Sequence, residues 1–449
     1  MTPEEFRKYG HETVDWIAEY MEGIRDYPVL SKVRPGELTA SLPGSAPEKG
    51  ETMEAILADF RRVIVPANTQ WNHPRFHAYF AVGAAPEGVL AEMLSAALNV
   101  NGMLWKSSPA ATELEMVTCG WLREWLGLPD EYFGMIHDTA STGVMHALAA
   151  ACHAADGSRS SLVLYCTGQT HSSVEKAAAA LGIGHVRKVA VDGRWRMDPA
   201  ALEQAVQSDI VAELRPCCVV ATVGTTAVAA IDPVKAVADV AQRHALWLHV
   251  DGAYGGPAAI VESRRGVLAG AERAQSVIVN PHKWMNVPVD CSVLYTRRPE
   301  VLRETFSLVP EYLRTAEDAS AVNLMDYAVA LGRRFRALKL WFVMRAWGRE
   351  RMAAMIDAHC RWARELAEWI EADARFEVAA PVELSLVCFR HRGGDEAGRA
   401  LMEAINGSGF AFLSHTVLDG RFVLRFAIGN HQTTREDVRA VWERIAGLA

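Results

Sequence analysis

The sequence lacks the cysteine patterns of a metal site or of a disulfide-stapled domain. Its eight cysteines are scattered, no two form a Cys-x-x-Cys pair, and none has a histidine at metal-ligand spacing. We therefore expect reduced thiols, mostly in the core, and no metal site. Because the first residues carry no export signal, the same pattern predicts a cytoplasmic protein.

Long apolar runs and basic clusters are missing too. No apolar stretch approaches the roughly 18 residues of a membrane span, so no membrane association is expected. The formal net charge is -8, and no basic run is longer than Arg333, Arg334 and Arg336, which argues against a nucleic-acid partner. Lysine is scarce, with nine lysines against 37 arginines. A lysine in apolar surroundings therefore stands out.

What is present indicates a large α/β protein. The chain has 449 residues, half of them apolar, enough for two or three packed domains. Residues 4–24 have the apolar spacing of a helix, which predicts an N-terminal arm packed on another domain or subunit. Apolar runs between 161 and 295, several of them separated by helical segments, predict a mainly parallel, buried sheet. Residues 384–390 and 422–428 predict strands of a smaller α+β region, closed by a helix that opens with the capping box 433–436.

A lysine follows one of the predicted strands, at the sheet edge where open α/β folds bind ligands. Lys283 lies in a loop between two apolar strands, beside His282 and Trp284. Desolvation and nearby positive charge would lower its pKa and free the amine as a nucleophile. A lysine that merely extends its stem along apolar surface would give the same pattern.

Three further features lie at the same predicted edge. Asp251 ends an apolar strand, and a buried carboxylate needs a cation such as a protonated pyridine nitrogen, unless it only caps the next turn. His171 could lie flat on such a ring, although a lone histidine is more often structural. The small and hydroxyl residues 138–143, ahead of the helical run 144–151, suit a phosphate or a plain helix cap.

Together these features supply an amine, an anionic partner, a stacking group and a phosphate anchor, all of which pyridoxal 5'-phosphate requires. The chain also resembles, over nearly its whole length, the aromatic L-amino acid decarboxylase family, the group II pyridoxal 5'-phosphate decarboxylases. The resemblance rests on Asn280-Pro281-His282-Lys283-Trp284, His249–Tyr254, His171–Glu175, His73–Phe76, Ser108–Glu115 and Gly332–Arg336.

The resemblance implies an aminotransferase-type (fold type I) α/β fold and a homodimer with its active sites at the interface. Residues 1–84 would form a helical arm packing on the partner subunit. Residues 85–350 would form the large cofactor domain, and residues 351–449 a small α+β domain.

The resemblance also assigns catalytic roles by position. Lys283 becomes the Schiff-base lysine, Asp251 the partner of the ring nitrogen, and His171 the stacking residue. Tyr312 matches a loop tyrosine that returns a proton to Cα after CO2 leaves. The remaining cofactor contacts would be Ala140, Ser141, Thr226, Ala253, Asn280 and His282. The implied reaction turns an aromatic L-amino acid into an arylalkylamine and CO2.

A substrate wall follows from the same resemblance, although aromatic residues there would also suit ordinary core packing. It comprises Trp71, Tyr79, Phe80, Val82, Val100 and Gly332, with Asn101 and Met103 approaching from the partner subunit. Glycine at 332 leaves room for a large ring, which favours tryptophan, 5-hydroxytryptophan or DOPA. The departures Ala81-Val82, Asn101 and Met103 could move the preference towards tyrosine, phenylalanine or a non-standard aromatic amino acid.

Three alternatives to simple decarboxylation are an aldehyde synthase, an aminotransferase and a non-catalytic homologue. An aromatic aldehyde synthase would release hydrogen peroxide and ammonia, an aminotransferase would consume a keto acid, and a non-catalytic cofactor-binding homologue would have lost a catalytic group. The presence of Tyr312 and His171 favours simple decarboxylation over the aldehyde synthase. None of the expected groups is missing, which speaks against the non-catalytic alternative.

Overall fold

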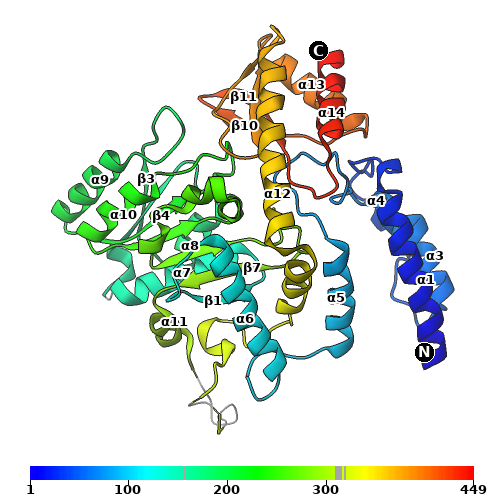
Figure 1. The fold of residues 1–449 in the computed structure, drawn as a ribbon, viewed down its shortest axis with the longest axis horizontal. Helices are drawn as coiled ribbons and strands as arrows, with labels where there is room; N and C mark the ends of the chain where they lie inside the picture. The colour runs from blue at the N-terminus through cyan, green and yellow to red at the C-terminus, as the bar shows by residue number, and fades with distance from the viewer. Residues whose placement is uncertain (156, 309–315, 318–319) are drawn as a thin grey trace.

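Two β-sheets organise the chain in the computed structural model, which describes all residues except 156, 309–315 and 318–319 (Figure 1). The larger sheet has the order β1-β7-β6-β5-β4-β2-β3; β7 runs antiparallel to both neighbours and the other pairs are parallel. Its strands are β1 (Phe133–His137), β2 (Leu162–Thr167), β3 (His185–Val189), β4 (Arg215–Thr222), β5 (Trp247–Asp251), β6 (Ser276–Val279) and β7 (Ser292–Thr296). The predicted α/β fold with a mainly parallel sheet is confirmed.

Helices cover both faces of this sheet because alternate side chains of each strand point to opposite faces. In β2, Val163 and Tyr165 belong to one core, whereas Leu162 and Leu164 belong to the other. The first core packs against α6 (Pro109–Leu126), α9 (Pro199–Val211), α10 (Val234–Arg243) and α12 (Ala337–Glu371). The second packs against α7 (Ala140–Ala155), α8 (Ser173–Leu181) and α11 (Pro299–Phe306).

The smaller sheet is antiparallel and has the order β10-β11-β9-β8. Its strands are β8 (Phe376–Val378), β9 (Leu386–His391), β10 (Ser414–Leu418) and β11 (Arg421–Ala427), packed with α13 (Asp395–Gly407) and α14 (Arg435–Leu448). The capping box predicted at 433–436 lies one residue later, because Thr434 accepts the N–H of Asp437 while the Asp437 carboxylate accepts the N–H of Thr434. Helix α12 links the two sheets and is interrupted at Gly348.

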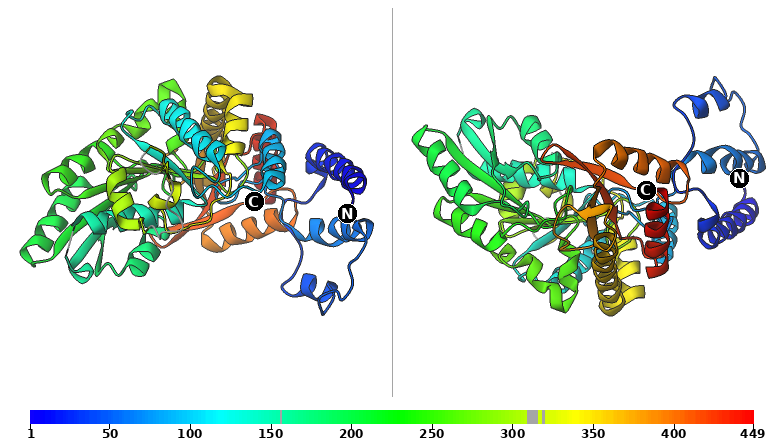
Figure 2. Two further views of the ribbon diagram at one scale, coloured as in Figure 1. Left: turned by 90° about the horizontal axis from the view of Figure 1, so that it is seen from below. Right: turned by 90° about the horizontal axis from the view of Figure 1, so that it is seen from above.

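The N-terminal arm stands to one side of the body (Figures 1 and 2). Helix α1 (Pro3–Glu22) begins with a capping box at Thr2, and none of its residues is buried. Trp16 packs edge-on against Phe60. The elements that follow are η1 (Ile24–Asp26), α2 (Glu37–Ser41), α3 (Met53–Asp59), η2 (Phe60–Ile64), α4 (Val65–Ala67) and α5 (Pro86–Leu98). Further along the chain lie the 3-10 helices η3 (Arg159–Ser161), η4 (Gly256–Ile260), η5 (Glu262–Leu268), η6 (Ala271–Arg273) and η8 (Leu324–Tyr327).

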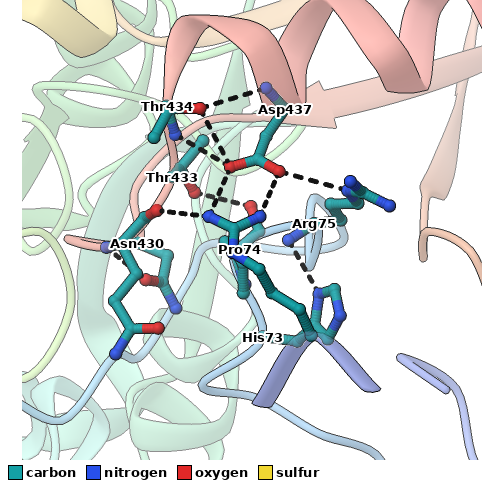
Figure 3. Close-up of polar contacts among 9 residues, drawn as sticks. His73, Pro74, Arg75, Asn430, Thr433, Thr434 and Asp437 are labelled. Atoms are coloured by element: carbon teal, nitrogen blue, oxygen red, sulfur yellow. Dashed lines mark hydrogen bonds and ion pairs between the residues drawn. The ribbon is translucent and has the colours of Figure 1, made fainter. Parts of the chain in front are cut away.

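A buried carboxylate at the start of α14 joins this arm to the C-terminal region. Asp437 accepts hydrogen bonds from Arg25 at 2.9 Å and from Arg75 Nε at 3.1 Å. Thr433 donates to the carbonyl of Pro74 (Figure 3). The segment that leads from Arg75 into the predicted substrate wall is therefore fastened to α14.

No helix in the described part of the chain combines the length and the apolar character needed to cross a membrane.

Candidate active site

A cavity of about 200 Å³ lies at the carboxyl ends of the parallel strands. All nine residues predicted to contact the cofactor line it, together with Phe80 of the predicted substrate wall. The full lining is Phe80, Thr139, Ala140, Ser141, His171, Ser173, Thr222, Gly224, Thr226, Asp251, Ala253, Tyr254, Asn280, His282 and Lys283. The sheet thus brings together residues that lie far apart in the sequence, because its parallel strands end at one edge.

Lys283 contributes an amine to the cavity from the loop between β6 and β7. Its backbone N–H donates to the carbonyl of Asn280 at 3.0 Å, which folds the loop back so that the side chain lines the cavity. Burial lowers the pKa of Lys283, and the Asp251 carboxylate opposes this effect. A lowered pKa leaves more of the amine unprotonated near neutral pH, as nucleophilic attack requires.

Asp251, the last residue of β5, places a carboxylate in the same cavity. It is 6% exposed, and its Oδ1 accepts the N–H of Ala253 at 3.0 Å. The turn-capping contact considered from the sequence is therefore present. It engages one carboxylate oxygen, so a role in turn capping and a role towards a bound cation are compatible.

His171 reaches the cavity from the loop between β2 and α8. Its Nδ1 accepts the backbone N–H of Ser173 at 3.2 Å and contacts the Ser173 hydroxyl at 2.8 Å. Burial lowers the pKa of His171, with Asp251 opposing and Lys283 adding to the effect. A neutral ring with Nδ1 as acceptor carries its proton on Nε2. The residue as a whole remains exposed in the single chain, although its Nδ1 contacts are partly buried.

The first turn of α7 also lines the cavity. The helix begins at Ala140, so Ala140 and Ser141 belong to its first turn instead of preceding a helix at 144. Small and hydroxyl side chains are compatible both with a segment before the helix and with its first turn. The close approach of α7 to β6 favours the longer helix, which begins at Ala140. At Gly143, an added Cβ would lie 2.2 Å from Ile278 Cδ1. The first-turn N–H groups of α7 suit an anion.

His282 and Asn280 also line the cavity, and their side chains contact each other. His282 Nδ1 accepts the N–H of Cys291 at 2.9 Å, and its Nε2 lies 3.2 Å from the side-chain amide nitrogen of Asn280. Burial, with a smaller contribution from Lys283, lowers the pKa of His282 to about 4. The residue is therefore neutral at physiological pH.

These groups fit pyridoxal 5'-phosphate. The amine, the carboxylate and the helix N-terminus are the three groups that its carbonyl, ring nitrogen and phosphate require. Thr222, at the end of β4, lines the cavity with a buried Oγ1 that has no hydrogen-bond partner among the described residues. An unsatisfied buried hydroxyl is costly, and a polar ligand would satisfy it.

A stack of aromatic rings backs the cavity beneath Lys283. The Phe80 ring lies 3.6 Å from that of Tyr254, which in turn lies 5.0 Å from that of Trp284. Trp284 Nε1 donates to His359 at 3.0 Å. The stack is buried and fixes the position of Phe80.

The other predicted wall residues do not line this cavity. Trp71 and Tyr79 stack with centroids 5.9 Å apart and are 39% and 51% exposed. Asn101 and Gly332 form a second group with Met103. The Asn101 Nδ2 atom lies 3.6 Å from Met103 Sδ, and a Cβ added at Gly332 would lie 3.9 Å from the same Nδ2 atom. Val82 and Val100 are half-buried. Tyr312 lies outside the described residues.

Arg425 is a residue near the site that the sequence reasoning missed. It is 3% exposed in β11 and donates to Ser414 Oγ at 2.7 Å and to the carbonyls of Thr226, Ala227 and Tyr79 at 2.6, 3.0 and 3.3 Å. Burial lowers its pKa. Asp251 was identified because it is a charged residue in an otherwise apolar strand. The same pattern in the predicted strand 422–428 would have identified Arg425.

Comparisons with known proteins identify the family of this chain. The model of the pyridoxal-dependent decarboxylase conserved domain matches residues 35–392. Tryptophan decarboxylase 2 of Oryza sativa subsp. japonica is 39% identical over 99% of this chain and 94% of its own length. Phenylacetaldehyde synthase of Arabidopsis thaliana is also 39% identical, over 99% of this chain and 96% of its own. The crystal structure of Oryza sativa TDC with PLP and tryptamine superimposes with a TM-score of 0.97 at 37% identity, covering 100% of this chain and 98% of that one. The chain belongs to the pyridoxal-dependent decarboxylase family.

Proposed function

We propose that this chain is a carboxy-lyase that uses pyridoxal 5'-phosphate to convert an aromatic L-amino acid into the arylalkylamine and CO2. The observation that carries the proposal is the single cavity that holds the Lys283 amine, the Asp251 carboxylate, His171 and the first turn of α7. Relatives that act on tryptophan and tyrosine support the aromatic class.

Each residue has a distinct part in this proposal. When bound, pyridoxal 5'-phosphate supplies an electron sink for the charge left on Cα as CO2 departs. Lys283 holds the cofactor through its ε-amine, and Asp251 keeps the ring nitrogen protonated. Ala140 and Ser141, with Asn280 and His282, bind the phosphate.

The other groups orient the substrate and manage the proton. His171 presents its Nε2 proton and a flat ring to the substrate side of the cofactor, while Thr226 and Ala253 line the cofactor ring. Holding the scissile carboxylate in one orientation selects decarboxylation over competing reactions. Tyr312 is proposed as the proton donor to Cα, and Trp71, Tyr79, Phe80, Val82, Val100, Asn101, Met103 and Gly332 as the wall against the substrate ring.

The reaction is tested by incubating the purified protein, loaded with cofactor, with a panel of aromatic amino acids. CO2, amine and hydrogen peroxide are measured together, because the similarity to phenylacetaldehyde synthase equals that to the decarboxylase. Amine in a one-to-one ratio with CO2 and no peroxide is the expected result. Peroxide in step with CO2 would contradict it in favour of an aldehyde synthase.

We propose that the working unit is a homodimer whose partner covers the exposed wall residues. An apolar stripe on α5 supports this proposal: Leu90, Leu94 and Leu98 recur every fourth residue and are 51%, 50% and 60% exposed. A continuous apolar face of this kind usually belongs to an interface. Helix α1, which has no buried residue, supplies a second uncovered surface.

The dimer is tested with the double variant Leu90→Glu and Leu94→Glu in light scattering after gel filtration. Charges in an apolar interface should give a monomer that has lost most of its activity. Val211→Glu is the control, because Val211 is an exposed apolar residue at the end of α9. A double variant that keeps the wild-type mass would rule out this interface.

We further propose a cytoplasmic location. All eight cysteines are free and buried, which suits a reducing compartment. Fractionation of the source cells would test this, and recovery with an exported fraction would contradict it.

A further inference from the structure

A buried ion pair lies outside the cofactor cavity, between Arg333 and Glu115 of α6. The two side chains are 5% and 4% exposed, and Arg333 Nη2 lies 2.6 Å from Glu115 Oε1. The same Oε1 accepts the N–H of Ile136 at 2.8 Å, and the carbonyl of Ile136 accepts from Arg333 at 3.0 Å. The pair and both polar groups of Ile136 therefore form a closed ring of contacts that fixes the Arg333 side chain on β1.

The backbone of Arg333 is fixed by different contacts. Its N–H donates to Asn101 Oδ1 at 2.9 Å, and its carbonyl accepts the N–H of Gly102 at 2.9 Å. Asn101 contacts Met103, and Gly332 immediately precedes Arg333. The side chain of Arg333 thus binds β1, while its backbone binds the wall group of Asn101, Met103 and Gly332.

Strand β1 connects this contact to the cofactor end of the molecule. Ile136 is its penultimate residue, and the chain then runs through Thr139 to Ala140 in the first turn of α7, both of which line the cavity. Arg333 consequently contacts both the wall group and β1, the strand that leads to the first turn of α7.

We propose that Arg333 is a positioning residue for substrate selection: it sets where Asn101 and Met103, which reach the partner's site in the proposed dimer, and the adjoining Gly332 lie relative to the end of β1. The inference rests on the proposed function. Arg333 touches no substrate and acts through the wall. Ser108 and Met325 also hold the carbonyls of Asn101 and Met103, so a shorter donor at 333 moves the wall without unfolding it.

The test compares Arg333→Lys with Arg334→Ala in the cofactor-loaded protein. Lysine keeps the charge, but its side chain ends one bond short of the Nη2 atom that donates to both Glu115 and Ile136. Arg334 is the matched control, because it is the next residue and its ion pair with Glu92 is exposed. The readouts are kcat and KM for tryptophan and phenylalanine, and the Kd of tryptamine and phenethylamine by calorimetry.

A selective loss is expected. Arg333→Lys should raise the KM for tryptophan and the Kd of tryptamine about tenfold, with at most about a threefold change for phenylalanine and phenethylamine. The absorbance of the bound cofactor should persist, and Arg334→Ala should match the wild type. Glu115→Asp, which keeps the carboxylate but shortens its reach, should show the same selectivity and serves if Arg333→Lys does not fold.

A uniform loss for all four ligands, with a lowered unfolding midpoint, would overturn the inference and leave Arg333 a purely structural residue. This outcome is distinct from failure of the proposed function. In that case the wild type itself would release no CO2 from any aromatic amino acid.

Discussion

The cofactor cavity and the substrate wall differ in how completely one chain builds them. Cavity residues such as Asp251 and His282 are buried and hydrogen-bonded at the ends of strands. The wall is divided into an exposed pair, Trp71 and Tyr79, and a separate group around Asn101. The difference teaches that a single chain assembles the cofactor cavity at the edge of its large sheet, whereas the predicted substrate wall lies on segments that a single chain leaves partly exposed.

Substitutions in the cofactor cavity should reduce activity more than substitutions in the wall. Lys283→Ala removes the amine of the cavity and should lower kcat by about a thousandfold or more, as losses of a covalent catalyst do. It should also abolish the absorbance at about 420 nm expected for a lysine-bound cofactor. Absorbance spectra and initial rates check both. Lys176→Ala, at an exposed position on α8, is the control; a band that survives in Lys283→Ala would assign the cofactor to another lysine.

Arg425 joins the two regions, because it binds Thr226 on the cavity side and Tyr79 on the wall side. Arg425→Met leaves buried carbonyls unpaired and should cost about 3 kcal/mol of unfolding free energy. A displaced wall should lower kcat/KM about a hundredfold as well. Urea unfolding and kinetics measure the two effects, with Arg421→Met, exposed on the same strand, as the control. Unchanged kinetics in a destabilised variant would show that Arg425 does not couple the regions.

Asp437 binds Arg25 and Arg75, which precede the wall residues in the sequence. Its substitution should change the free energy of unfolding and leave the reaction itself unaffected. Burial raises the pKa of its carboxyl, but Arg25, the N–H of Thr434 and Arg75 outweigh burial and lower the pKa to about 2. The unfolded value is about 3.9. A group with a lower pKa in the folded state adds stability that is complete above the unfolded pKa and is lost as the pH falls through the folded one.

Asp437→Asn should therefore cost about 1 to 3 kcal/mol at pH 6, and its difference from the wild type should shrink between about pH 4 and pH 2. Urea unfolding across this range measures it. Asp395→Asn, whose contact with Arg390 is 3.5 Å long and partly exposed, should show no such trend. A difference that stays constant with pH would mean that the charge of Asp437 contributes nothing.

The same division decides how much the sequence could predict. The cavity could be predicted because polar residues follow several apolar runs in the sequence. Parallel strands bring such residues to one edge of the sheet. Strand β1 was not predicted, because a glycine such as Gly134 usually indicates an interruption of a strand. Here the glycine permits close packing, since an added Cβ would lie 2.7 Å from both Cys119 and Tyr295. The start of α7 and the box at Thr434 were misplaced because small and hydroxyl residues suit both a cap and a first turn.

The wall could not be derived from periodicity, because its members meet only through contacts distant in sequence, such as Arg333 with Asn101. Their predicted roles came from the family resemblance and stay predictions. Gly332 shows why. Its φ requires no glycine, and a Cβ there would meet only Asn101 Nδ2, at 3.9 Å, so folding gives no reason for glycine at this position.

Gly332→Ser should accordingly leave the fold intact and produce the smallest effect, confined to substrate preference. If Gly332 belongs to the wall, the added side chain takes space from a large ring and should lower kcat/KM for tryptophan about tenfold relative to phenylalanine, the scale expected for small changes in a binding pocket. Competition between the two amino acids in one reaction measures the ratio directly. Gly420→Ser would be a poor control because its φ is +75°; Gly120→Ser, with open space around its Cβ, is a better one. An unchanged ratio would remove Gly332 from the wall and place the selection of the ring with Trp71 and Tyr79 instead.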